Sequence, residues 1–504
     1  MILLNTLLTA SAMAAVPAQE VKQPNVVVFL IDDMGVMDTS VPFLPGTDGN
    51  PVKYPLNEWY RTPNMERMAE KGIRFSTFYA QSVSSPSRAS LLTGKNSARH
   101  HTTTWINPTV NNRTQFGPPA WNWEGIRPDT QTLPKILSES GYRSILVGKA
   151  HFGPKGSFAE DPLNIGFDVN IGGCGTGQPG SYYGEDGYGN IKGSKVHAVP
   201  GLEKYHGTDT FLTEALTLEA NAEVSKAVKD NKPFFLYMSH YAVHSPFQPD
   251  KRFIANYSDS DKSNRAKAYA SLVEGMDKSL GDLMDHLEKE GVAENTLILF
   301  LGDNGGDAPL GEINGHFSSA PLRGKKGSVY EGGTRVPFLA CWAKPDASNE
   351  IQKAFPIEQG GVQMQPGTIM DLFPTILKIT GVNVPAGEVI DGIPLDTQFK
   401  GKFDKKRKGT VLMHFPHGEH NGNYFTTFRS GDWKIIYQYN PSDPANPQVA
   451  LYNLKKDPFE NNDISKQEPK RVRTLVKELA QALEKEGAQY PVDIDGNEIR
   501  PVIR

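Results

Sequence analysis

The stretch Asn25-Val26-Val27-Val28-Phe29-Leu30-Ile31 is followed at once by two acidic residues, Asp32 and Asp33. Its apolar run is short for a helix and rich in β-branched residues, which favours a strand buried on both faces. Such strands are typical of parallel sheets that helices cover on both sides. The stretch therefore predicts an α/β fold with Asp32 and Asp33 at the carboxyl end of a central strand.

Three later runs have the same length and character: Arg143–Val147, Pro233–Met238 and Thr296–Leu301. Polar residues follow each run: Lys149 and His151, then His240 and His244, then Asp303 and Asn304. In open α/β sheets, binding and catalytic residues gather beyond the carboxyl ends of the strands. We therefore expect one site to form at this edge of the sheet.

Helical patterns alternate with these runs, and one helix is expected at Gln131–Ser140, capped by Thr130. The pattern changes near residue 400, where a basic stretch leads into shorter β-like runs and a final amphipathic helix. The expected short strands are Val411–Phe415, Tyr424–Phe428 and Trp433–Tyr437. We predict a main domain over residues 21–399 and a smaller C-terminal α+β module over residues 400–504.

The charge balance makes some partners improbable. The chain has 504 residues with 53 Lys and Arg against 57 Asp and Glu, a formal net charge of −4. Neither nucleic acid nor an anionic membrane is therefore expected as the main partner. Cys174 and Cys341 are the only cysteines, and the apolar run around Cys341 indicates a buried thiol.

The first residues have the character of a targeting segment. An apolar core from Ile2 to Leu8, followed by small residues that suit cleavage, predicts a signal peptide over residues 1–20. No later segment is apolar enough to span a bilayer. We expect the mature protein to be exported and soluble, either periplasmic or secreted.

The most specific motif is Ser84-Ser85-Pro86-Ser87-Arg88-Ala89-Ser90-Leu91-Leu92-Thr93-Gly94. Pro86 suits the first turn of a helix and Gly94 its end, which places Ser84 at a helix N-terminus that favours an anion. Arg88 lies one turn further on the same face and is expected to reach that anion with two hydrogen bonds. Alone, such a motif would equally suit an ordinary helix cap and a surface cation.

The motif resembles the signature of the type I sulfatases: Cys or Ser, any residue, Pro, Ser, Arg, three residues, Leu, Thr, Gly. The resemblance implies the alkaline phosphatase-like fold, a large mixed sheet flanked by helices. It also implies that Ser84 is oxidised to 3-oxoalanine (formylglycine). Serine at this position is similar to bacterial carbohydrate sulfatases and implies a formylglycine-generating maturation enzyme of the anaerobic radical type as a partner.

Further motifs extend the resemblance over roughly residues 24 to 465. They include Gly148-Lys149-Ala150-His151, in which alanine replaces the family's tryptophan, Ala242-Val243-His244-Ser245-Pro246, and Pro321–Gly327. The implied catalytic residues are Ser84, Arg88, Lys149, His151, His244 and Lys326. The implied metal ligands are Asp32, Asp33, Ser84, Asp303 and Asn304, hard oxygen donors that suit Ca²⁺ or Mg²⁺. Gly302 stands where the family most often has Thr or Ser.

The resemblance also implies a mechanism. A hydroxyl of the hydrated formylglycine attacks sulfur, while Arg88, Lys149, Lys326 and the metal neutralise the sulfate oxygens. With Lys326, His244 protonates the departing alcohol, and His151 accepts the proton whose loss expels sulfate.

Segments rich in imidazole and indole groups are candidates for binding a sugar: His100, His101, Trp105, His414, His417 and Arg429. Each would equally serve packing. We favour hydrolysis of sulfate esters on a sulfated carbohydrate, whether polysaccharide, glycosaminoglycan or mucin glycan. The alternatives left open are an arylsulfatase, a phosphatase or phosphodiesterase of the same superfold with unmodified Ser84, and a non-catalytic carbohydrate-binding relative.

Overall fold

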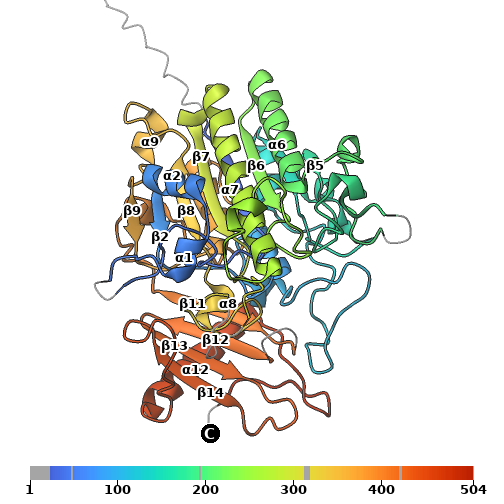
Figure 1. The fold of residues 1–504 in the computed structure, drawn as a ribbon. Coiled ribbons are helices and arrows are strands. Elements are labelled where there is room, and N and C mark those ends of the chain that lie inside the picture. The colour runs from blue at the N-terminus through green and yellow to red at the C-terminus, as the bar shows by residue number, and fades with distance from the viewer. Residues whose placement is uncertain (1–22, 47–48, 192–194, 312–317, 419–422, 503–504) are drawn as a thin grey trace, which may run out of the picture.

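The computed structural model describes residues 23–46, 49–191, 195–311, 318–418 and 423–502 (Figure 1). The predicted signal peptide, residues 1–20, lies outside them. A large sheet dominates the fold, with strand order β5-β4-β6-β1-β7-β8-β2-β9. The strands span, in chain order, β1 Asn25–Ile31, β2 Ile73–Phe75, β4 Arg143–Gly148, β5 Val169–Ile171, β6 Phe234–His240, β7 Thr296–Gly302, β8 Phe338–Trp342 and β9 Gly361–Gln363.

The four strands predicted from apolar runs are all present and lie next to one another. They are β4, β6, β1 and β7, and each pairs with its neighbour in parallel. β8 runs antiparallel to both β7 and β2, which makes the sheet mixed, as the resemblance implied. The carboxyl ends of the four parallel strands therefore meet at one edge of the sheet.

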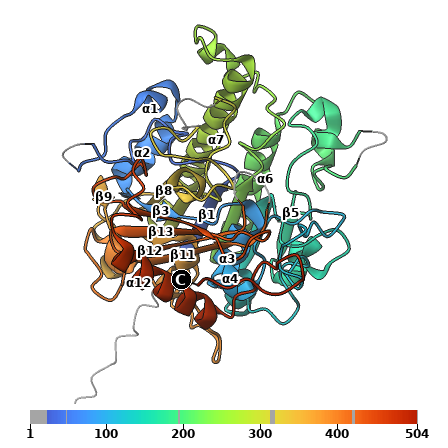
Figure 2. The same ribbon diagram turned by 90° about the horizontal axis from the view of Figure 1, so that it is seen from below.

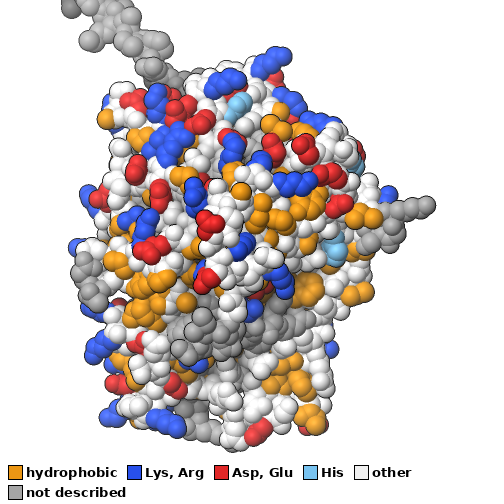
Figure 3. Space-filling view, viewed as in Figure 1, with side chains coloured by type: hydrophobic (Ala, Val, Ile, Leu, Met, Phe, Trp, Pro, Cys, Tyr) orange, Lys and Arg blue, Asp and Glu red, His pale blue; other side chains and the backbone are white. Residues whose placement is uncertain are grey.

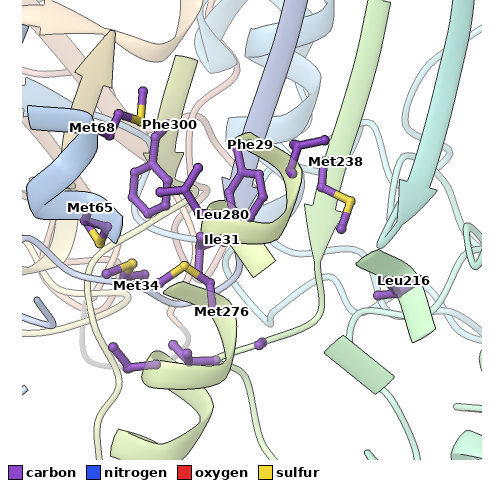
Figure 4. Packing of buried hydrophobic residues seen from close by; sticks show 14 of the residues in the cluster. Phe29, Ile31, Met34, Met65, Met68, Leu216, Met238, Met276, Leu280 and Phe300 are labelled. Carbon is purple, nitrogen blue, oxygen red and sulfur yellow. The ribbon is translucent and has the colours of Figure 1, made fainter. Parts of the chain in front are cut away.

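Helices cover both faces of this sheet because β1 is apolar on both sides. Phe29 and Ile31 pack in one cluster with α2, α6 and α7, whereas Val28 and Leu30 pack in another with α3, α5 and α10. Figure 4 shows the first cluster, where Phe29 lies among side chains of β6, β7 and α7. The helices span α2 Pro63–Lys71, α3 Ser84–Thr93, α5 Leu133–Glu139, α6 Leu212–Lys229, α7 Asn264–Lys289 and α10 Leu372–Thr380.

The helix predicted at Gln131–Ser140 is shorter in the structure. α5 spans Leu133–Glu139, and the side chain that caps it belongs to Thr132, so the prediction of Thr130 as the cap is wrong. Pro134 explains the shift, because a proline has no N–H to donate and is tolerated only in the first turn of a helix.

A four-stranded antiparallel sheet forms the C-terminal module, below the large sheet in Figure 1 and towards the viewer in Figure 2. Its strands are β11 Thr410–Phe415, β12 Phe425–Ser430, β13 Trp433–Gln438 and β14 Gln448–Asn453. The first three match the predicted strands, and β14 is an additional one. Helix α12 (Pro469–Glu486) packs Leu475, Leu479 and Leu483 against this sheet. The α+β module is therefore present, while the domain boundary at residue 400 stays a prediction.

A buried cluster of charged and polar side chains links this sheet to residues earlier and later in the chain. Lys434 Nζ of β13 lies 2.9 Å from Glu331 Oε1 and 2.8 Å from Glu460 Oε1. The Tyr79 hydroxyl donates to Glu331 Oε2 at 2.7 Å. None of these four residues is more than 3% exposed. We call Tyr79, Glu331, Lys434 and Glu460 the junction cluster.

The surface shows no charge segregation on the face drawn in Figure 3, where Lys and Arg side chains are interspersed with Asp and Glu. Among the described residues, no helix is long and apolar enough to cross a membrane. Cys174 and Cys341 are both free, and Cys341 is buried as expected.

Candidate active site

The strand ends bring most of the predicted site residues to one place. Asp32 and Asp33 leave β1, Lys149 and His151 follow β4, His244 follows β6, and Asp303 and Asn304 follow β7. His240 is an exception, because it is the last residue of β6 and its Nε2 lies 2.8 Å from Ser279 Oγ of α7.

Ser84 reaches the same edge at the first position of helix α3, which Gly94 ends in the left-handed conformation with φ 67°. Its Oγ lies 3.0 Å from Asp32 Oδ1, 3.3 Å from Asn304 Oδ1 and 3.2 Å from Lys149 Nζ. The helix N-terminus adds a partial positive charge at this point. Position 84 therefore suits a group that reacts with an anion.

Three carboxylates converge beside Ser84. One oxygen each of Asp32, Asp33 and Asp303 lies within 4.8 Å of the others, and none of the three residues is more than 2% exposed. Asn304 Nδ2 donates to Asp33 Oδ1 at 2.9 Å, which directs its carbonyl oxygen toward Ser84. Carboxylate and amide oxygens are the donors that calcium and magnesium prefer. The donor set therefore fits one hard divalent cation.

Two lysines accompany these carboxylates. Lys149 Nζ donates to Asp32 Oδ2 at 2.7 Å, and Lys326 Nζ lies 2.7 Å from Asp33 Oδ1. Burial lowers the pKa of Lys149, and Asp32 opposes that shift. Burial alone would raise the pKa of Asp33, but Lys326 and His244 hold it below its usual value. Asp33 therefore stays ionised, with Lys326 as its counter-charge.

Arg88 differs from the expectation that it reaches an anion bound in the site. Its Nε and Nη2 both donate to Asp303 Oδ2, at 3.0 and 2.9 Å, and its Nη1 donates to Lys149 O and Ser239 Oγ. The residue is fully buried and does not line the cavity beside Ser84. In the structure Arg88 makes its two-bond contact with Asp303, and a contact with a bound anion stays a prediction. Arg88 orients a carboxylate of the cluster.

His151 has the hydrogen bonds of a neutral base. Its Nε2 lies 2.7 Å from Ile106 O, and because a carbonyl can only accept, Nε2 carries the proton. Nδ1 is then unprotonated and lies 3.4 Å from Ser85 Oγ. Burial, reinforced by the charge of Lys149, keeps the pKa of His151 well below its usual value.

A backbone carbonyl also fixes the orientation of His244. Its Nδ1 donates to Ser245 O at 2.9 Å, and its Nε2 lies 3.5 Å from Asp33 Oδ2. Burial lowers the pKa of His244 to about 4, although Asp33 opposes the shift. His244 is therefore neutral in this arrangement, with its proton on Nδ1, and Nε2 must take up a proton before the ring can act as an acid.

A cavity of about 270 Å³ opens beside these residues. It is lined by Ser84, Trp105, Ile106, Pro108, Lys149, His151, Gly177, Gln178, His197, His244, Asp307 and Lys326. The hydroxyl, the two lysines and the two histidines of the candidate catalytic set thus share one concave space, which is the arrangement a catalytic site requires.

Three polar lining residues, Gln178, His197 and Asp307, are not among the residues that we predicted from the sequence. Gln178 belongs to the glycine-dense loop 172–180 that follows β5. A Cβ on Gly177 would lie 2.7 Å from His151 Cε1, so glycine lets this loop pack directly on the imidazole. Glycine density just after a strand was the signal available in the sequence.

Comparison with known protein families identifies the family of this chain. A family model described as Sulfatase matches residues 24–382, more than half of the chain. The chain belongs to the sulfatase family. The protein is a sulfuric ester hydrolase, and its C-terminal part also matches a model described as N-sulphoglucosamine sulphohydrolase, C-terminal, over residues 325–500.

Named relatives of this sulfatase cover most of its length. N-acetylgalactosamine-6-sulfatase of Mus musculus is 31% identical over 86% of this chain and 77% of the relative. The Homo sapiens protein of the same name is 30% identical over 88% and 81%. Among solved structures, Ps i-CgsB in complex with k-i-k-neocarrahexaose is 26% identical with a TM-score of 0.71, covering 92% of this chain and 93% of that one.

Of the residues predicted to bind substrate in this sulfatase, most lie away from the catalytic cavity. Trp105 lines the cavity, whereas His100, His101, His414, His417 and Arg429 do not. Each of these five has a partner elsewhere in the fold: Ser90 for His100, Gly487 for His101, Thr426 and Gln489 for His414, Thr103 for His417, and Tyr79 for Arg429. Their role in substrate binding remains a prediction.

Proposed function

We propose that this sulfatase removes sulfate from a sulfated glycan, with Ser84 oxidised to formylglycine and with one divalent cation, calcium or magnesium, bound beside it. The observation that carries the proposal is the position of the Ser84 hydroxyl. It lies on the wall of the cavity and within 3.3 Å of Asp32 Oδ1, Asn304 Oδ1 and Lys149 Nζ. The relatives named N-acetylgalactosamine-6-sulfatase are 29–31% identical and those named arylsulfatase are 25–27% identical, which supports a carbohydrate over an aryl sulfate.

The cation would be held by Asp32, Asp33, Asp303 and Asn304, together with position 84. When bound, formylglycine and the cation supply a hydrated aldehyde as the nucleophile and extra positive charge near the sulfate. Arg88 is a positioning residue in this proposal, because it holds Asp303 with two hydrogen bonds.

The lysines are proposed to bind the sulfate group. Lys149 and Lys326 both line the cavity and both carry an N–H-rich ammonium group toward the acidic cluster. Charge-assisted hydrogen bonds of this kind stabilise oxygens that gain negative charge in a transition state.

The histidines are proposed to move the protons. His244 lines the cavity, and Nδ1 donates to Ser245 O. In this proposal Nε2 is protonated when substrate is bound and passes that proton to the departing alkoxide. His151 Nδ1 is unprotonated and lies 3.4 Å from Ser85 Oγ, and in this proposal it accepts the proton whose loss expels sulfate.

The remaining parts of the proposal come from the sequence. Residues 1–20 would act as a signal peptide for the periplasm or the exterior, ahead of a catalytic domain over residues 21–399 and a subdomain over residues 400–504. A maturation enzyme of the anaerobic radical type would oxidise Ser84.

Sulfate release from defined saccharides tests the proposal. Protein co-expressed with such a maturation enzyme should release sulfate from at least one galactose, N-acetylhexosamine or uronate sulfate, and a chelator should abolish this activity. Elemental analysis should find one calcium or magnesium ion per chain. Two zinc ions per chain, with phosphate esters as the better substrates, would contradict the proposal and favour a phosphatase.

A further inference from the structure

The catalytic cavity continues into a second one of similar size. The second cavity has a volume of about 320 Å³. Its lining residues are Gln178, Pro179, Gly180, Gly189, Ile191, His197, Ser245 and Pro246. Gln178 and His197 line both cavities. His244 lines the first cavity and the next residue, Ser245, lines the second, so the two spaces adjoin along three separate segments of the chain.

The shared wall is held in one arrangement. The Thr176 hydroxyl donates its proton to Gln178 O at 2.9 Å. Thr176 Oγ1 also lies 2.8 Å from His197 Nδ1, and since its only proton is already donated, His197 Nδ1–H must be the donor there. His197 Nε2 is then an acceptor on the cavity wall. Gly180 N also donates to His197 O at 2.7 Å, which ties the two segments together.

The lining of the second cavity is neutral. Among the described residues that line it, none is Asp, Glu, Lys or Arg. It offers an amide, an imidazole and a hydroxyl, together with the apolar surfaces of two prolines and of Ile191, which is 50% exposed. Hydroxyl groups of a sugar can bond with the first three, and the C–H face of its ring can pack on the others. An anionic group on a bound sugar, such as a carboxylate, would have no positively charged partner among these residues.

A third cavity also touches the catalytic one, but less closely. It shares only Asp307 with the catalytic cavity, and Lys325 Nζ lies 3.1 Å from that carboxylate. The second cavity is therefore the better continuation of the site.

We propose that the second cavity binds the sugar next to the sulfated one, and that this neighbour is an uncharged ring. The substrate is then at least a disaccharide, and Gln178 and His197 contact the region where its two rings are linked. This inference rests on the proposed glycan sulfatase function.

Matched pairs of substrates test the proposal. Each pair consists of a sulfated monosaccharide, such as N-acetylgalactosamine 6-sulfate, and the same unit extended by a neutral hexose or by a uronate. For the sulfated unit that is turned over, the neutral extension should raise kcat/KM by about tenfold or more, and the uronate should raise it less. An aryl sulfate serves as the reference for the chemistry at position 84.

Two single substitutions locate the effect. Ile191→Ala changes a residue that lines only the second cavity, and it should reduce the gain from the neutral hexose at least about threefold while leaving the monosaccharide unchanged. Val196→Ala is the matched control, because Val196 is 48% exposed and lines neither cavity. That variant should keep the full gain.

Equal kcat/KM for the monosaccharide and both disaccharides would overturn the second site but leave the glycan sulfatase function in place. An unchanged disaccharide gain in Ile191→Ala would also overturn it. Turnover of the aryl sulfate with no sulfate release from any saccharide would overturn the proposed glycan function, and the second site with it.

Discussion

In the described part of the chain, the strand-end carboxylates and the junction cluster are both groups of buried charges, and they differ in their access to a cavity. Buried cations accompany Asp32 and Asp303, and the partly buried Lys326 accompanies Asp33. The buried Lys434 accompanies the carboxylates of the junction cluster. Residues beside the first group line a space that can admit a substrate, whereas no junction residue lines a described cavity.

The comparison shows that burial of charge does not by itself mark a reactive site. Burial shifts pKa values in both groups: it raises the pKa of Glu460 to about 7 and lowers the pKa of His244 to about 4. What distinguishes the site is that a hydroxyl, three carboxylates and two lysines converge on accessible space. We therefore expect changes in the site to affect catalysis, and changes in the junction cluster to affect stability.

The largest effect is expected for Asp303→Asn, which keeps the size of the side chain but removes its charge. Activity should fall at least about 1000-fold, and bound calcium or magnesium should be lost, because the substitution removes one charged donor of the cluster. Kinetics with elemental analysis measures both. Glu460→Gln, in the junction cluster, is the matched control and should stay within about twofold of the parent; equal losses in the two variants would remove the distinction between the clusters.

Lys434→Met tests the other side of the comparison. It leaves Glu331 and Glu460 buried without their shared lysine, and breaking a buried ion pair in this way costs about 3–5 kcal/mol. Calorimetry should show a lower unfolding temperature, while kcat/KM per folded molecule should not change. A Lys434→Met protein with normal stability and a large loss of kcat would place the junction cluster in the catalytic machinery.

His244→Ala sharpens the role of one residue within the site. Sugar sulfates have poor alkoxide leaving groups and need a proton donor, so their kcat should fall about 100-fold. For an activated aryl sulfate, kcat should fall less than about tenfold, because its phenolate is a good leaving group that needs no proton donor. Similar losses on the two substrates would argue against His244 as the acid.

The central strands could be predicted from the sequence because both faces of each are apolar, as in Asn25–Ile31. The meeting of their polar ends followed from the parallel topology. The sequence did not reveal Gln178 or His197, because loops bring them to the site and loops leave no periodic pattern. It also suggested His100 and His414 as sugar ligands, since a pattern cannot show that both ring nitrogens are already bonded within the fold.

The smallest effect on catalysis is expected for His414→Ala. Its two ring nitrogens bond to Thr426 Oγ1 and Gln489 O, at 2.8 and 2.7 Å. Loss of these bonds should lower the free energy of unfolding by about 1–3 kcal/mol. KM for a sulfated saccharide should stay within about twofold; a KM several times higher would support the sequence-based prediction that His414 binds substrate.

The identity of residue 84 in active protein tests the central claim most directly. Trypsin should release the peptide Phe75–Arg88, which contains Ser84, and mass spectrometry can locate a change within it. We expect this peptide to lack two hydrogen atoms at position 84, activity to rise in proportion to the converted fraction, and Ser84→Ala to be inactive. Full activity in protein whose Ser84 is intact would contradict the account.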